Sequence, residues 1–98
     1  MKNVNELLKD IARLKSNLHQ KDFLLTWEQS QDELTMVLDI AAALKGLRAD
    51  NIATNVFTNG LGISVFRDNS TRTRFSYASA LNMLGLAQQD LDEGKSQI

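Results

Sequence analysis

The pattern of apolar residues predicts two amphipathic helices in the first half of the chain. Over residues 4–19 apolar side chains recur every three or four positions, the spacing of one helix face. A second series of this kind predicts a helix from Ser30 to about Ala49, and Glu33, three residues after Ser30, completes the pattern of a capping box. The apolar positions are Val4, Leu7, Leu8, Ile11, Leu14 and Leu18, then Leu34, Val37, Leu38, Ala41, Leu44 and Leu47.

The second half of the chain has the pattern of a strand, a helix and a second strand. Residues 62–66 form a short apolar run, which is typical of a buried strand. A helix is expected over residues 71–84, with Ser70 as its N-cap and Gly85 as the glycine that ends it. Leu86–Gln88 is a candidate start of a second strand, and the polar segment DLDEGKSQI after it is expected to be a loop.

Two groups of apolar side chains are expected to be buried. Phe23 and Trp27 lie in a short segment, FLLTW, that should be extended or form a brief turn, and they are predicted to anchor the core between the first two helices. The helix over 71–84 is expected to bury one face, formed by Phe75, Ala78, Leu81 and Leu84.

These elements indicate an α/β fold. A strand–helix–strand unit is the start of a parallel sheet, and parallel sheets need cover on both faces. Two strands alone make a poor sheet. Residues 1–98 are therefore expected to be the leading part of a larger α/β protein.

Composition and charge restrict the possible functions. The chain has 98 residues, 43% of them apolar, and a net charge of −1, which argues against a general binder of nucleic acid. It contains no cysteine, so disulfides and thiolate metal sites are excluded, and a reducing cytoplasm is a fitting location. No stretch approaches the ~20 apolar residues of a membrane span, so a soluble protein without a membrane partner is expected.

The start of the helix over 71–84 is a candidate anion site. Helix N-termini carry partial positive charge and usually attract acidic residues, yet residues 71–85 contain none, and Arg72 and Arg74 lie near the start. The sequence Ser-Thr-Arg-Thr-Arg places three hydroxyls and two guanidinium groups where a strand turns into a helix, a geometry suited to phosphate. A second hypothesis is that the arginines only form a surface network with the nearby acidic residues, Asp68, Asp90, Asp92 and Glu93. Spacing alone does not decide between the two.

The segment FRDNSTRTR resembles the carbamoyl-phosphate motif of the aspartate and ornithine carbamoyltransferase family. It matches every position of the family's S-T-R-T-R core and has the same strand–turn–helix context. The stretches DFLLTWEQSQDELTMVLDIAAALK and FSYASALNMLGLAQQDLDEGKSQI are most similar to the YgeW-type subgroup of that family. The resemblance implies that the chain is the N-terminal part of a carbamoyl-phosphate-binding domain in a two-domain enzyme.

The resemblance also implies a role for each matching residue. Ser70, Thr71, Arg72 and Thr73 would bind the phosphate group of carbamoyl phosphate, with Arg72 and Thr73 as the catalytic residues. Arg74 is more often structural in this family. Gln97, in GKSQI, matches a glutamine of the carbamoyl-phosphate site of ornithine-type enzymes.

The implied activity is transfer of the carbamoyl group to an amine, such as that of an amino acid, without a metal or other cofactor. The family is trimeric, so a homotrimer is expected. The residues before the core, Arg67-Asp68-Asn69, differ from the family's common pattern and leave the acceptor open. The alternative is a non-catalytic anion-binding or assembly module that keeps the fold; the 98 residues alone are not expected to catalyse.

Overall fold

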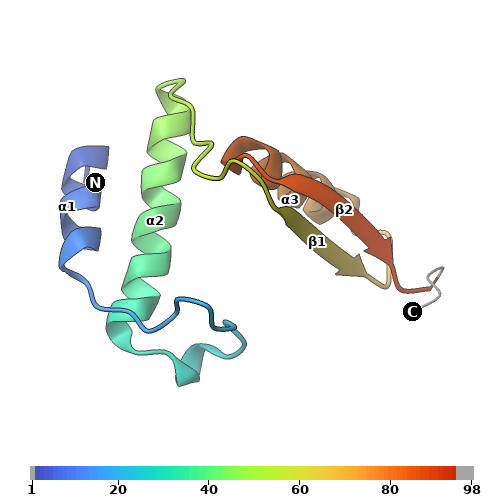
Figure 1. Ribbon diagram of the computed structural model, residues 1–98, viewed down its shortest axis with the longest axis horizontal. Coiled ribbons are helices and arrows are strands. Elements are labelled where there is room, and N and C mark those ends of the chain that lie inside the picture. Colours follow the sequence, from blue (N-terminus) through green and yellow to red (C-terminus); the bar gives the residue numbers. More distant parts are fainter. Residues whose placement is uncertain (1, 95–98) are drawn as a thin grey trace. The chain divides into compact units, whose positions relative to one another are not determined.

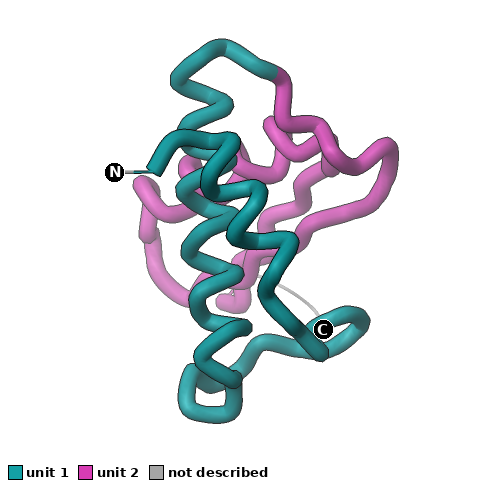
Figure 2. The backbone as a smooth tube through the Cα atoms, turned by 90° about the vertical axis from the view of Figure 1, so that its left-hand side faces the viewer, with its two compact units in different colours: residues 1–52 teal, residues 53–98 magenta. Residues whose placement is uncertain are grey.

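The computed structural model describes residues 2–94, which form two compact units. In chain order the elements are α1 (Val4–Arg13), a 3-10 helix (Thr26–Glu28), α2 (Gln31–Ala49), β1 (Leu61–Phe66), α3 (Thr71–Leu84) and β2 (Ala87–Asp92), as Figure 1 shows. Residues 1–52 form the helical unit and residues 53–98 the α/β unit (Figure 2). The mixture of helices and a parallel sheet confirms the predicted α/β class.

The helical unit consists of α1 packed against α2 (Figure 1). Leu7 of α1 and Ala43 of α2 are its buried apolar side chains among the described residues. The second helix was predicted correctly: Ser30 is its N-cap and forms the expected capping box with Glu33. The Glu33 carboxylate also accepts a hydrogen bond from the main-chain N–H of Asn17 (2.9 Å). Bonds from the main-chain N–H groups of Ser30 and Asn17 hold the pKa of this carboxyl below its usual range.

The prediction that the first helix extends over residues 4–19 is wrong. Helix α1 ends at Arg13, and Leu14 is already extended (φ −81°, ψ 151°). The main-chain N–H groups of Lys15 and Asn17 instead donate to the carboxylates of Asp32 (3.4 Å) and Glu33. Acidic side chains in the first turn of α2 thus satisfy main-chain donors that a longer helix would have paired internally.

The segment before α2 has the expected conformation but not the expected burial. Leu25 is extended and the short 3-10 helix follows it, in agreement with an extended segment or brief turn. Trp27 is 79% exposed and Phe23 43% exposed, so neither anchors a core within the described residues. Trp27 lies in a helix of only three residues and Phe23 precedes that helix, whereas the buried apolar side chains of this unit come from α1 and α2.

The α/β unit is a strand–helix–strand element with a parallel two-stranded sheet. β1 and β2 pair from Leu61 opposite Ala87 to Phe66 opposite Asp92, and α3 packs on one face of the sheet (Figure 1). The strand predicted over 62–66 is confirmed. The second strand continues to Asp92, so the expectation of a loop from Asp90 onward is wrong for residues 90–92. Main-chain pairing with β1 outweighs the polar character of these residues.

Within the described residues of the α/β unit, α3 covers one face of the sheet and no element covers the other. Leu61, Ile63 and Val65 on β1 are each more than half exposed, whereas the intervening Ser64 is buried, which corrects the expectation of a fully buried strand. The alternation follows from the pleat, because successive side chains point to opposite faces and α3 lies on one of them. Leu81 of α3 is the buried apolar side chain of this unit.

The predicted buried face of α3 is correct at its C-terminal end and wrong at its start. Leu81 is buried and Ala78 and Leu84 are half-buried, but Phe75 is 72% exposed. Arg74, four residues before Ala78, takes the inward position instead. Gly62 permits this close packing, because a methyl group there would lie 2.4 Å from Leu81 Cδ1.

Gly85 ends α3 as predicted. Its φ of 92° lies in the left-handed region, which favours glycine. A Cβ at this position would also lie 2.1 Å from the main-chain oxygen of Phe57. Both the conformation and the close main-chain contact therefore require a residue without a side chain.

Replacement of Gly85 should destabilise the α/β unit. We expect Gly85→Ala to lower the free energy of unfolding by more than about 1 kcal/mol, because the φ is unfavourable for alanine and the methyl group meets main-chain atoms. Gly94→Ala is the control, since its Cβ would lie 3.4 Å from a side-chain oxygen of Asp92, an ordinary contact. Urea unfolding followed by circular dichroism measures both variants. Equal stability of the two would contradict the role assigned to Gly85.

Candidate functional site

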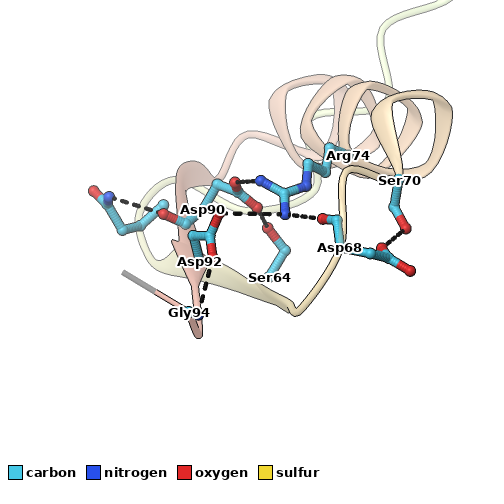
Figure 3. A network of polar contacts seen from close by, with 8 residues as sticks. Ser64, Asp68, Ser70, Arg74, Asp90, Asp92 and Gly94 are labelled. Atoms are coloured by element: carbon cyan, nitrogen blue, oxygen red, sulfur yellow. Dashed lines mark hydrogen bonds and ion pairs between the residues drawn. The ribbon is translucent and has the colours of Figure 1, made fainter. Parts of the chain in front are cut away.

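The turn between β1 and α3 leaves the start of α3 without a side-chain cap. Ser70 stands at the N-cap position with φ 25° and ψ 46°, and its hydroxyl caps no main-chain N–H, which corrects the expectation of a serine N-cap. The hydroxyl donates instead to the carboxylate of Asp68 (Figure 3). The first helical hydrogen bond of α3 runs from Arg74 N–H to Ser70 O (3.0 Å). Within residues 2–94, the N–H groups of Thr71, Arg72 and Thr73 have no acceptor.

The other two α-helices of the described chain begin differently. Asn3 caps α1 and Ser30 caps α2 through their side chains, and both helices carry acidic residues in the first turn. The first turn of α3 has neither an acidic residue nor a side-chain cap. Its N-terminus thus combines free N–H donors with the uncompensated positive end of the helix dipole, which is the arrangement of an anion site.

The side chains of Thr71, Arg72 and Thr73 extend this site. All three are exposed, and none forms a hydrogen bond or ion pair with another residue of the described chain. Four of the five predicted site residues, Ser70 to Thr73, therefore lie together at the first turn of α3. The fifth, Gln97, lies outside the described residues.

Arg74 belongs to the polar network of Figure 3, which connects it to the turn and to β2. Its Nη1 donates to Asp90 Oδ2 (3.0 Å), and its Nη2 donates to the main-chain oxygen of Asp68 and lies 3.9 Å from Asp92 Oδ2. The guanidinium carbon stands 4.8 Å from the centre of the Phe66 ring. The Arg74 side chain is only 20% exposed, so these contacts are partly shielded from water.

The two hypotheses for the arginines apply to different residues. Arg74 pairs with Asp90 and Asp92, as the surface-network hypothesis predicts, and reaches Asp68 through its main-chain oxygen instead of its carboxylate. Arg72 has no such partner among residues 2–94 and remains available to an external anion.

Asp90 and Asp92 belong to this network, although the sequence pattern predicts a loop at these two positions. Asp90 links the two strands to α3, since it also accepts a hydrogen bond from Ser64 Oγ (2.6 Å). The sequence Asp-Leu-Asp indicates that the two carboxylates lie together, because residues two apart share one face of a strand.

Over the described residues, no group of three or more acidic, histidine or cysteine side chains is arranged to hold a metal ion. Nor does that part of the chain contain a helix of the length and apolarity needed to cross a membrane.

Sequence comparison identifies the protein family of this chain. Residues 21–98 match the family model described as "Aspartate/ornithine carbamoyltransferase, carbamoyl-P binding domain". The chain belongs to this family, and the match covers α2, the turn and all of the strand–helix–strand unit.

Individual relatives lie within the same family. The chain is 81% identical over all 98 residues to a protein of Escherichia coli named "Putative carbamoyltransferase YgeW". It is 32% identical over 83 residues, 85% of the chain, to an ornithine carbamoyltransferase of Prochlorococcus marinus subsp. pastoris. The chain spans 25% of the length of the first relative, and the matched region spans 26% of the second.

Arg74 is expected to contribute to stability, in contrast to Arg72. Arg74→Ala should lower the free energy of unfolding by about 1.5–3 kcal/mol, since it removes charge-assisted hydrogen bonds from a mostly buried side chain. Arg72→Ala should change it by less than about 0.5 kcal/mol, because the side chain is exposed and unpaired within residues 2–94. Urea unfolding of the two variants tests the contrast. A larger loss in Arg72→Ala would show that Arg72 has a structural partner instead.

Proposed function

We propose that the chain is the N-terminal part of a longer carbamoyltransferase and supplies its carbamoyl-phosphate site. In this proposal the free N–H groups and side chains of the first turn of α3, Ser70 to Thr73, bind the phosphate group. Arg72 is the principal counter-charge, because a guanidinium group matches two phosphate oxygens at once. Gln97 is proposed to belong to the same carbamoyl-phosphate site.

One observation carries this proposal. Among the α-helices of residues 2–94, α3 alone begins with no side-chain cap and no acidic residue in its first turn, and there the S-T-R-T-R motif lies. Two arginines beside the positive end of a helix repel it, and Arg74 is neutralised by Asp90 while Arg72 is not. A bound anion would remove that remaining repulsion. The match to a carbamoyl-P binding domain supports the phosphate of carbamoyl phosphate as this anion.

The proposed reaction needs no metal and no covalent intermediate with the enzyme. The amine nitrogen of the acceptor attacks the carbonyl carbon of carbamoyl phosphate; the C–N bond forms and the C–O bond to phosphate breaks. The departing phosphate takes up the proton that the amine loses. The Thr73 hydroxyl would donate to the carbonyl oxygen as negative charge grows on it, and Arg72 would neutralise the departing phosphate. Donors fixed in advance at these two points lower the barrier. Binding both reactants at one site provides the remaining acceleration.

The acceptor and the location are further parts of the proposal. The relative named ornithine carbamoyltransferase supports an acceptor of the amino-acid type. The cysteine-free composition fits a reducing compartment, so we propose that the enzyme acts in the cytoplasm.

Replacement of Arg72 should weaken ligand binding in the full-length protein. We expect Arg72→Ala to raise the Kd for carbamoyl phosphate at least about tenfold, since each charge-assisted bond contributes roughly 1.5–3 kcal/mol. Arg67→Ala is the matched control, because Arg67 pairs with Glu93 (2.7 Å) and its side chain is 84% exposed. Titration calorimetry measures both. An unchanged Kd in Arg72→Ala would contradict the proposed site.

The full-length protein is expected to be a homotrimer, on the basis of its family. Multi-angle light scattering at micromolar concentration measures its mass directly. A monomeric mass under these conditions would refute this part of the proposal.

A further inference from the structure

The Ser70 hydroxyl has an internal partner in the structure. A hydroxyl has one hydrogen to donate, and Ser70 donates it to the carboxylate of Asp68. Ser70 is also one of the residues proposed to bind phosphate. Within the segment from Arg67 to Arg74, Asp68 is the single acidic residue. The Asp68 carboxylate therefore accepts the hydrogen bond that the Ser70 hydroxyl would donate to a bound phosphate group.

We propose that Asp68 is an internal competitor of the phosphate group, an inference that rests on the proposed function of this site. In the free protein its carboxylate occupies the Ser70 hydroxyl, and it leaves that hydroxyl when phosphate binds. Asp68 thus lowers the affinity of the site and decides which anions can enter it.

The chemistry of the two groups makes them competitors and not partners. A carboxylate and a fully ionised phosphate group both only accept hydrogen bonds, so each needs the Ser70 hydrogen, and their negative charges repel each other. With one hydrogen on the hydroxyl, Ser70 can donate to only one of them at a time. A phosphate can replace Asp68 because it also engages the free N–H groups of Thr71 to Thr73 and the side chain of Arg72. A small monovalent anion has fewer such contacts with which to displace the carboxylate.

The contacts of Asp68 allow its side chain to move while the turn stays in place. Its main-chain oxygen accepts a hydrogen bond from Arg74, which is itself held by Asp90 and stands over the Phe66 ring. The residue is exposed, and among residues 2–94 its carboxylate bonds to Ser70 alone. Rotation of the side chain into water would free the Ser70 hydroxyl without breaking the hydrogen bond that fixes the main chain (Figure 3).

Two substitutions in the full-length protein test this inference. Asp68→Ala removes both the charge and the acceptor, whereas Asp68→Asn removes the charge and keeps an amide oxygen that can still accept from Ser70. We expect Asp68→Ala to bind inorganic phosphate and carbamoyl phosphate about fivefold more tightly than the unmodified protein, and Asp68→Asn to show an intermediate gain. Asp22→Ala is the control for loss of one exposed carboxylate, and its affinity should not change. Titration calorimetry gives the Kd values, and circular dichroism verifies that each variant is folded.

The possible results separate this inference from the proposed function. Tighter binding in Asp68→Ala, with no change in Asp22→Ala, supports the competitor role. Unchanged or weaker binding in both Asp68 variants, together with weaker binding in Arg72→Ala, overturns the competitor role and leaves the phosphate site intact. If no variant binds either ligand, the proposed function fails as well. An equal gain in Asp22→Ala would show that only net charge matters, and would also overturn the role of Asp68.

Discussion

The α/β unit depends on one side chain, the guanidinium group of Arg74, which joins three segments. It reaches β2 through Asp90 and Asp92, the turn through the main-chain oxygen of Asp68, and the end of β1 through the ring of Phe66. Asp90 passes the connection on to Ser64 in the middle of β1. Because the group is largely shielded from water, its hydrogen bonds are stronger than those of an exposed ion pair and fix the turn against the sheet. The position of the first turn of α3, and with it the candidate phosphate site, follows from this arrangement.

The two arginines of the S-T-R-T-R motif therefore perform different tasks. Arg74 is neutralised by acidic side chains within the fold, and Arg72 extends from the helix start without a partner among the described residues. If both were neutralised internally, the helix end would have little affinity for an anion; if neither were, the turn would lack its attachment to the sheet. Asp68, the acidic residue nearest the motif, contacts both regions: its main-chain oxygen accepts a hydrogen bond from Arg74, and its carboxylate accepts one from the Ser70 hydroxyl. Asp68 thus connects the attachment of the turn with the proposed phosphate site.

The exposed face of the sheet fits the proposal that the chain is part of a longer protein. Leu61, Ile63 and Val65 form an exposed apolar row on the face of the sheet opposite Ser64, and parallel sheets ordinarily have both faces covered. The 98 residues correspond to 25% of the length of the relative with 81% identity. An apolar sheet face of this kind is consistent with the proposal that further segments of the same protein complete the domain.

The sequence by itself determined the local structure and the motif. The capping box of Ser30 and Glu33, the strand over 62–66, the helix over 71–84 and the glycine at its end all follow from short-range rules of capping, periodicity and backbone conformation, and they were predicted correctly. The motif Ser70 to Arg74 identified the family for the same reason, since its residues are adjacent in the chain. The tertiary structure decided what depends on partners distant in sequence. It ended α1 at Arg13 because Asp32 and Glu33 bond to the main chain after it, and it made a strand of Asp90 to Asp92 by pairing with β1. In the tertiary structure Arg74 points inward and Phe75 outward. The Ser70 hydroxyl donates to Asp68 and does not cap the helix. These outcomes depend on which groups meet in space, and hydrophobic periodicity carries no information about that.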